Sequence, residues 1–208
     1  MILLATRSAG KLRELRPMFA RAGLDAIDLT ALGIAEVADE EAVEAFETFE
    51  ENALAKARFF ARRSGLTTVA DDSGLEVLAL GGRPGVRSKR FSGRDDLRGR
   101  ELDDANNATL QRELAPHSDR RARFVCAAAL VGTEALEIVR RGETAGIMLA
   151  APRGIDGFGY DPFFQSDELG RTFAEAAVSE KERVSHRGRA FRALLDAVST
   201  VDPDGVAR

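Results

Sequence analysis

The chain has 208 residues, of which 44% are hydrophobic and 31% are charged, and its 30 basic and 34 acidic residues give a net charge of −4. This composition predicts a globular protein of one domain, or of one domain with two lobes, and it lacks the basic excess of a general nucleic-acid binder. The single cysteine, Cys126, excludes a disulfide within the chain and a cysteine metal site, and two histidines are too few for a multi-histidine metal centre.

The apolar segments of the chain bear on where the protein works. The first apolar run, residues 1–5, is too short for a signal peptide, and no stretch is long enough to span a membrane. We therefore expect a cytoplasmic location and no membrane partner. With sulfur and imidazole ligands scarce, any metal would be a hard cation with oxygen ligands, and Mg²⁺ is the first expectation.

The first 65 residues predict one strand and two helices. Residues 2–5 form a buried strand, 6–11 a polar loop, and 12–22 a helix with a kink or broken turn at Pro17. Residues 25–43 are acidic and loosely patterned, with 39–41 expected in a loop. Thr48 and Glu51 fit a capping box, which begins a firm helix that ends at Gly65.

Two adjacent carboxylates follow the next apolar run. Residues 66–70 predict a short buried strand, and it ends in Asp71, Asp72, Ser73 and Gly74. Buried carboxylates are costly unless they are paired, hydrogen-bonded or bound to metal. Neighbouring side chains on an extended chain point to opposite faces, so only one of the pair is expected to face a given site, and Gly74 then permits a turn. The alternative is a polar strand end with an Asx-type turn.

The remaining residues alternate between strands and helices, which predicts an α/β fold with a mixed sheet. The expected segments are an apolar run 75–80, a Gly/Pro loop 81–85, a charged exposed stretch 92–104, a helix 105–114, strands 123–131, 135–141 and 143–149, a glycine- and aromatic-rich loop 154–164, a last helix from about 187 to 198, and a polar tail from 199.

The polar loop after the first strand is a candidate phosphate site. It offers Thr6, Ser8, backbone amides near Gly10, and Lys11 at the start of a helix, where free amides attract anions. It is not a Walker loop, because Lys11 is followed by Leu12 rather than by the Ser or Thr that would hold Mg²⁺. The alternative is a plain strand-to-helix turn with a surface lysine.

Three further groups carry candidate chemistry. The acidic cluster near Glu44 contains a residue that could reach a metal beside Asp72, although spacing alone does not decide which.

In the loop 157–162, Phe158 and Tyr160 alternate with glycines, which suits stacking on a base. The alternative is that one of these rings fills the core.

The last group is Lys181 with Ser185, His186 and Arg187, at the expected start of the final helix. The helix dipole disfavours cations there, which indicates an anionic or acceptor ligand, and the alternative is a solvated basic face.

In this order the groups resemble the inosine triphosphate pyrophosphatase family, the house-cleaning hydrolases of non-standard purine nucleoside triphosphates. The resemblance covers residues 2–196 and rests on motifs at 5–11, 48–53 with Lys56, 70–75, 84–86 with Ser88 and Arg90, 157–162 and 185–188. The family's first motif usually reads Thr-Gly-Asn, and here Arg7 replaces the glycine and Ser8 the asparagine.

The resemblance implies a two-lobed α/β fold over residues 1–198, with a long mixed central sheet flanked by helices, an active site in the cleft between the lobes, a homodimer, and a polar tail at 199–208. Glu44 and Asp72 would hold Mg²⁺, Asp72 or Asp71 would be the general base, and Lys11 and Lys56 would neutralise the phosphates. The residues that would hold the nucleotide are Thr6, Arg7, Ser8, Ala9, Gly10, Lys11, Ser73, Phe158, Gly159, Tyr160, Asp161, Lys181, His186 and Arg187.

The implied reaction is Mg²⁺-dependent hydrolysis of ITP, dITP and XTP between the α and β phosphates, giving the monophosphate and pyrophosphate and cleansing the nucleotide pool. Two rivals remain open at this stage. One is a pyrophosphatase of similar architecture that acts on modified pyrimidine nucleotides, and the other is an inactive nucleotide sensor.

Overall fold

The computed structural model describes residues 1–37, 40, 43–132 and 136–200. Residues 199 and 200 are described by their backbone alone. The loop expected at 39–41, the start of the strand at 135–141, and the tail from 201 lie wholly or partly outside the described residues. No helix in the described part of the chain is long and apolar enough to cross a membrane.

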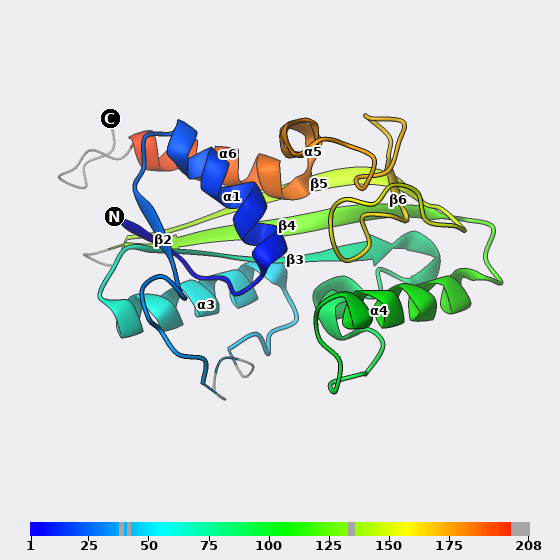
Figure 1. Cartoon of the computed structure of the whole chain (residues 1–208), viewed down its shortest axis with the longest axis horizontal. Coiled ribbons are helices and arrows are strands. Elements are labelled where there is room, and N and C mark those ends of the chain that lie inside the picture. Colours follow the sequence, from blue (N-terminus) through cyan, green and yellow to red (C-terminus); the bar gives the residue numbers. More distant parts are fainter. Residues whose placement is uncertain (38–39, 41–42, 133–135, 201–208) are drawn as a thin grey trace. The chain divides into compact units, whose positions relative to one another are not determined.

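One mixed sheet holds the strands that the structure describes, in the order β2-β1-β3-β4-β5-β6 (Figure 1). The strands are β1 (Ile2–Leu4), β2 (Ala26–Asp28), β3 (Thr68–Val77), β4 (Arg121–Val131), β5 (Glu137–Met148) and β6 (Phe164–Ser166). β1 pairs in parallel with β2 and β3, whereas β5 and β6 are antiparallel. The predicted α/β class and mixed sheet are confirmed.

The chain divides into two compact units. The first contains residues Met1–Asp72, Cys126–Gly142 and those from Arg189 onward, and the second contains Ser73–Val125 and Glu143–Gly188. Strand β3 therefore passes from one unit into the other at the peptide bond between Asp72 and Ser73.

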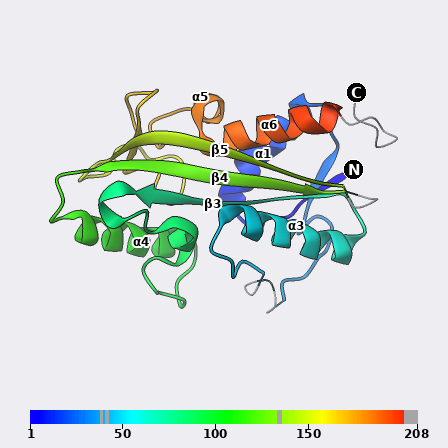
Figure 2. The same cartoon turned by 180° about the vertical axis from the view of Figure 1, so that it is seen from behind.

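In the first unit, helices lie on both faces of the strands. α1 (Ala9–Arg21) and α6 (His186–Thr200) lie on one face, and α3 (Phe49–Ser64) lies on the other (Figures 1 and 2). Fully buried side chains of α1, α6 and the strands make one core, in which Phe19 and Phe191 meet edge to face with ring centroids 6.1 Å apart. The predicted helical periodicities of the first and last helices are thereby confirmed.

The second unit has its own core. α4 (Gly99–Leu114) and α5 (Val178–Val184) lie on opposite sides of its strands (Figure 2), with two short 3-10 turns, η1 (Leu78–Leu80) and η2 (Gly85–Arg90). Phe124 packs against Phe164 and Phe173, with ring centroids 4.7 and 5.9 Å away. α5 and β6 were not predicted, because both are shorter than the windows in which periodicity is visible.

Several boundaries differ from the sequence predictions. α1 begins at Ala9, three residues early, because Ser8 caps it, and it continues through Pro17 without ending. α4 begins at Gly99, so the stretch expected to be exposed and charged already contains the first turns of a helix. The two strands expected at 135–141 and 143–149 form one strand, β5, that runs through Gly142.

The segment with the two carboxylates shows the largest difference. β3 runs unbroken through Asp71, Asp72, Ser73 and Gly74, so neither a strand end nor a turn occurs there. The expectation of a turn at Gly74 was wrong. The strand continues because partners from neighbouring elements compensate the carboxylates, and a local sequence pattern does not contain those partners.

The packing of the first unit generates a stability prediction. Phe191→Ala should lower the free energy of unfolding by about 3–5 kcal/mol, because it empties a ring volume in a core where the side chain is 0% exposed. The matched control is Phe46→Ala, whose ring is 46% exposed and which should change stability far less. Urea denaturation followed by circular dichroism measures both, and equal losses would contradict the described core.

Candidate active site

Asp71 in β3 is a buried carboxylate held by a lysine. Its side chain is 1% exposed, and Lys11 Nζ lies 3.0 Å from its Oδ2 and 3.4 Å from its backbone oxygen. Cys126 Sγ on β4 lies 3.7 Å from the same Oδ2, within sulfur hydrogen-bond range. Lys11 thus reaches from the first turn of α1 to the strand, which brings the start of this helix and the Asp-Asp motif together.

Asp72 is buried as well, and its environment is more strongly acidic. It is 9% exposed and accepts a hydrogen bond of 3.0 Å from Asn52 Nδ2. Burial raises its pKa to about 6, and the negative charge of Glu44 adds to that increase, while Lys56 and Lys11 oppose it. The carboxylate therefore gains a proton in a range where an ordinary aspartate is fully ionised.

Lys56 joins the two acidic elements. It lies four residues after Asn52 on α3, hence on the same helix face, and its ammonium pairs with the Glu44 carboxylate. Burial opposes the charged form of Lys56, but Glu44, Asp71 and Asp72 together raise its pKa, so it stays an ammonium. Glu44 is therefore coupled to the Asp-Asp motif through Lys56 and through its charge on Asp72.

The cluster of Glu44, Asp71, Asp72, Lys11 and Lys56 has the donor chemistry of a magnesium site. Its candidate ligands are carboxylate oxygens, and the mutual repulsion of Glu44 and Asp72 is what a divalent cation relieves. Among the described residues, no group of three or more Asp, Glu, His or Cys side chains is placed so that it could hold a metal ion. Mg²⁺, which keeps several waters and takes one or two carboxylates, fits this sparse set.

The loop between β1 and α1 is built as a helix N-terminus. Ser8 caps α1 by accepting a hydrogen bond of 3.3 Å from Lys11 N, and the Ser8 amide bonds Thr6 Oγ1 at 3.2 Å. Ala9 and Gly10 follow the cap, where amides have no carbonyl partner within the helix. Anion binding by this loop stays a prediction, and Ser8, in place of the family's asparagine, caps the helix itself.

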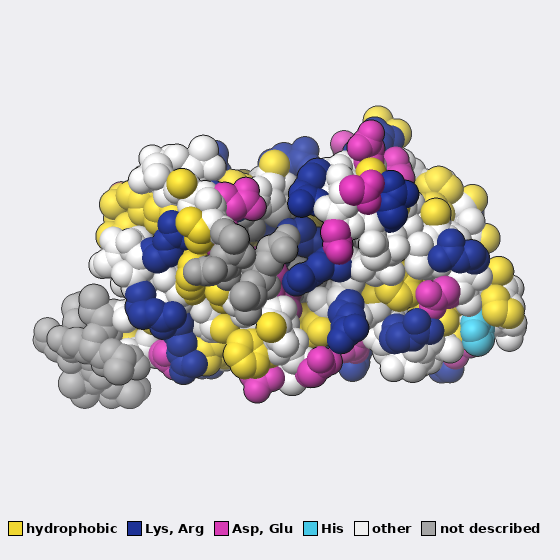
Figure 3. Space-filling model, turned by 90° about the horizontal axis from the view of Figure 1, so that it is seen from below, with side chains coloured by type: hydrophobic (Ala, Val, Ile, Leu, Met, Phe, Trp, Pro, Cys, Tyr) yellow, Lys and Arg dark blue, Asp and Glu magenta, His cyan; other side chains and the backbone are white. Residues whose placement is uncertain are grey.

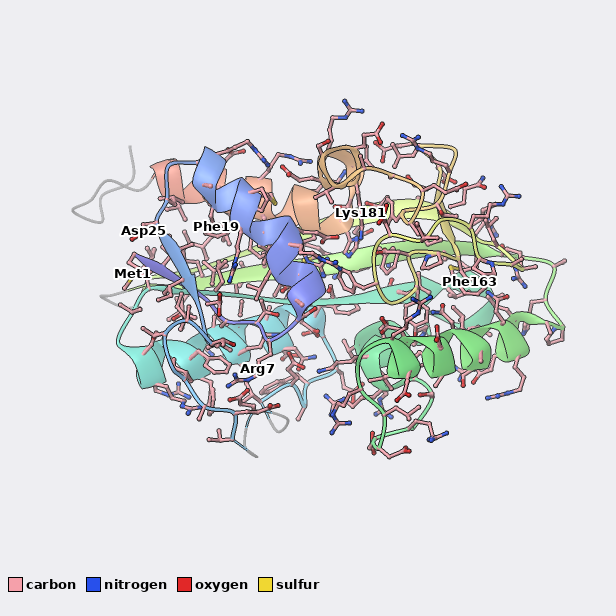
Figure 4. The ribbon with its side chains drawn as sticks, in the orientation of Figure 1. Met1, Arg7, Phe19, Asp25, Phe163 and Lys181 are labelled. Atoms are coloured by element: carbon pink, nitrogen blue, oxygen red, sulfur yellow. The ribbon has the colours of Figure 1, made fainter. Side chains whose placement is uncertain are left out.

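Arg7 departs from the family pattern, and its side chain is directed to a neighbouring loop (Figure 4). Its Nε and Nη2 donate to the two oxygens of Glu40 at 2.7 Å each, and Nη2 also donates to Ile34 O at 3.2 Å. The hydrogen bond from Arg7 lowers the pKa of Glu40. The guanidinium is thus engaged in a bidentate pair, and a nucleotide contact from Arg7 stays a prediction.

The second unit holds the other predicted residues, around the loop between β5 and β6. Lys181 Nζ lies 2.6 Å from Asp161 Oδ2, with both side chains at most 6% exposed, and the Phe158 amide donates to the same oxygen at 2.9 Å. The Lys181 ammonium lies 5.0 Å from the Phe158 ring centroid and 5.3 Å from that of Phe173. These residues form a cation–aromatic cluster in which Asp161 fixes both the lysine and the loop.

Arg187 and His186 extend this cluster from the start of α6. Arg187 Nη2 donates to Ser73 Oγ at 2.7 Å, and its guanidinium carbon lies 5.6 Å from the Phe158 centroid. The His186 ring stacks on Phe124 with centroids 4.6 Å apart and planes 9° from parallel. Since Arg187 and His186 are 2% and 3% exposed, the alternative of a solvated basic face is wrong.

The glycines of the loop have different roles. Gly157 has φ +77°, and a Cβ there would lie 2.3 Å from Asp161 Oδ2, so only glycine fits beside that carboxylate. Gly159 has φ +61° with open space around it, and its constraint is conformational. Tyr160 is 5% exposed, packs in the core and donates its hydroxyl to Ser88 O at 2.8 Å. The alternative reading, an aromatic that fills the core, therefore holds for Tyr160.

Sequence reasoning missed several residues of these two sets. Asn52, Cys126, Asp103 and Asn107 were not proposed, although Asn52 stands inside a quoted motif one helical turn before Lys56. That spacing was the available signal, because Asn in a helix interior is unfavourable and indicates a polar partner. Figure 3 shows basic side chains interspersed with acidic and apolar ones on one face, so surface charge alone does not mark these residues.

Comparisons with known proteins agree with one another. The model of the Ham1 family matches residues 2–197. A dITP/XTP pyrophosphatase of Frankia alni is 51% identical, covering 96% of this chain and 98% of that protein, and one of Thermus thermophilus is 44% identical, covering 97% and 93%.

Solved structures are similar over the same span. A HAM1 protein from Coxiella burnetii matches with a TM-score of 0.80 at 34% identity, covering 95% of this chain and 98% of that one. A nucleoside-triphosphatase (dITP/XTP pyrophosphatase) from Mycobacterium abscessus matches with a TM-score of 0.69 at 42% identity, with the same coverage.

The raised pKa of Asp72 generates a pH prediction. The folded protein holds the proton up to about pH 6, whereas the unfolded chain releases it near pH 3.8. Ionisation of Asp72 therefore lowers the free energy of unfolding, and this loss is absent below pH 4 and complete above pH 6. Asp72→Asn should therefore raise the free energy of unfolding of chelator-treated protein at pH 8 by up to about 3 kcal/mol.

This gain should shrink as the pH falls from 6 toward 4, which urea titrations at several pH values measure. Asp25→Asn, at an exposed position, is the control and should show no such dependence. A net loss of stability in Asp72→Asn at pH 8 would contradict the described electrostatics.

Proposed function

Because the chain belongs to the Ham1 family, we propose that it is a nucleoside triphosphate pyrophosphohydrolase that converts dITP and XTP to their monophosphates and pyrophosphate. ITP, which carries the same base as dITP, belongs to the proposed substrate range. A cytoplasmic location stays a prediction from the apolar segments of the sequence, and a homodimer stays a prediction from the resemblance.

The observation that carries the proposal is the cluster of three carboxylates and two ammoniums around β3. Glu44, Asp71 and Asp72 supply three negative charges against two positive charges from Lys11 and Lys56, so the fully ionised cluster is left with one net negative charge. Such a set attracts a divalent cation, while its lysines are suited to phosphate oxygens. The presence of all five charged residues argues against a nucleotide sensor without catalysis.

Glu44 and Asp72 would hold Mg²⁺. When bound, Mg²⁺ offsets negative charge on the phosphate oxygens and so favours attack on phosphorus. Lys11 and Lys56 contribute positive charge to the same oxygens, and the amides at the start of α1 add hydrogen-bond donors.

Of the two aspartates, Asp72 is the better proton acceptor for the attacking water. Asp71 is 1% exposed and ion-paired with Lys11, so it positions that lysine. Asp72 has a pKa of about 6, which lies close to the pH at which a general base is most effective.

The cluster in the second unit is suited to the base. Lys181 and Arg187 carry several donors each and no acceptor, and they contact Asp161 and Ser73. Donors of this kind match the 6-oxo group of hypoxanthine or xanthine and mismatch the 6-amino group of adenine. The Phe158 ring supplies a face for stacking.

A substrate panel tests the proposal directly. Purified protein is assayed with dITP, ITP, XTP, dATP and a modified pyrimidine triphosphate, with Mg²⁺, with Mn²⁺ and with excess chelator, and the products are separated by chromatography. We expect monophosphate and pyrophosphate, no activity with chelator, and dITP preferred over dATP by at least about 10²-fold in kcat/KM. Orthophosphate with a diphosphate, or equal use of dATP, would overturn the proposal.

The role of Asp72 has its own test. Asp72→Asn preserves the shape of the side chain and removes its charge, so kcat should fall by at least about 10²-fold, the lower range for loss of a general base. Asp25→Asn is the matched control and should retain full activity, since its side chain is exposed on the loop before β2 (Figure 4). Retention of most activity by Asp72→Asn in steady-state kinetics would assign the base elsewhere.

A further inference from the structure

Helix α4 binds the loop of Phe158 through both backbone groups of Gly159, its N–H and its C=O. Gly159 N donates to Asp103 Oδ2 at 2.8 Å, and Asn107 Nδ2 donates to Gly159 O at 2.9 Å. The first contact fixes the peptide between Phe158 and Gly159, and the second fixes the peptide between Gly159 and Tyr160. Figure 1 shows this loop running beside α4.

The two holding residues form a unit within the helix. Asp103 and Asn107 are four residues apart and therefore lie on one face of α4, where Asn107 Nδ2 also donates to Asp103 O at 2.9 Å. Asn107 is 6% exposed. One acceptor and one donor are thus presented at a fixed spacing by a rigid helix, which matches the N–H and C=O of a single residue.

Helix propensity does not explain Asp at position 103 or Asn at position 107. Asp and Asn are poor helix formers in the interior of a helix, and burial raises the pKa of Asp103 above its ordinary value. The arrangement therefore opposes local stability, which is typical of positions retained for a site.

What the two contacts control is the place of the Phe158 ring. Phe158 is directly joined to the held peptide, and its ring lies over the Lys181 ammonium at 5.0 Å and the Arg187 guanidinium at 5.6 Å. On the other side of the loop, the Tyr160 hydroxyl is bound to Ser88 O. Without α4, the peptide of Gly159, with φ +61° and open space around it, would be held only through its neighbours.

We propose that Asp103 and Asn107 are positioning residues that set the Phe158 ring for stacking on a purine and so contribute to the choice between 6-oxo and 6-amino bases. This inference rests on the proposed function for the role of Phe158. It assigns a part of specificity to a helix that contributes no side chain to the predicted nucleotide site.

The test compares adjacent aspartates. Asp103→Ala should raise KM for dITP by about tenfold, the effect of one lost charge-assisted hydrogen bond, with kcat changed far less and KM for dATP nearly constant. Asp103→Asn keeps an acceptor and should restore most of the affinity. Asp104→Ala, at the exposed neighbouring position, should behave as the unmutated protein.

A fluorescence measurement reports on the loop without any catalysis. The chain has no tryptophan, and Tyr160 is its single tyrosine, so intrinsic fluorescence originates in this loop. Acrylamide quenching should be stronger in Asp103→Ala than in the unmutated protein or in Asp104→Ala, with far-UV circular dichroism unchanged. Asn107→Ala is the second variant and should change quenching and KM in the same direction.

The outcomes separate the two proposals. Unchanged quenching in both α4 variants, or equal changes in KM for dITP and dATP, would overturn the positioning role even if dITP is hydrolysed. Absence of hydrolysis in the unmutated protein would overturn the proposed function and the specificity role with it. A quenching increase in the α4 variants would then show that α4 fixes the loop without a part in base choice.

Discussion

The burial of two consecutive carboxylates in mid-strand constrains everything around it in the first unit. Asp71 and Asp72 lie within β3, where an ionised group is costly unless cations or donors reach it. Lys11 reaches Asp71 from the first turn of α1, while Asn52 and Lys56, one helical turn apart on α3, face Asp72 and its acidic neighbourhood. Each helix must therefore meet the strand in one register only. A slip by one residue would leave a charge buried without compensation, so the polar cluster specifies the packing of the helices as well as carrying chemistry.

The second unit stabilises its buried cations in a different way. Its cations are buried against aromatic faces, with Lys181 and Arg187 beside the Phe158 ring, and they also contact oxygens of Asp161 and Ser73. Attraction to an aromatic face is weak compared with a paired charge. The first unit thus compensates its buried charges mainly with opposite charges, whereas the second adds aromatic faces.

The sequence was sufficient wherever a local signal decided the structure. Thr48 was predicted to cap α3, and its hydroxyl accepts the Glu51 amide at 3.2 Å, while Gly65 ends the helix in the left-handed region as expected. The path of β3 through Gly74 was not predictable, since the partners that permit it come from α1 and α3, far away in sequence. The start of α4 at Gly99 was missed because a run of charges conceals a helix whose buried face carries polar residues. Residue types and motif order thus indicated the chemistry, whereas the contacts that position those residues are long-range.

The pair of Arg7 and Glu40 constrains how this chain can evolve. The carboxylate has a second cationic neighbour, because Arg63 Nη1 lies 3.3 Å from the Glu40 Oε1 atom that also accepts from Arg7. A change of Arg7 to glycine, the residue usual in the family, would leave Glu40 with Arg63, whereas a change of Glu40 would leave two guanidiniums facing one another. The order of substitution therefore matters. Arg7 can be replaced while Glu40 is present, whereas Glu40 can be replaced only after Arg7 has changed. Within a lineage the acidic residue should consequently persist longer than the arginine that now binds it.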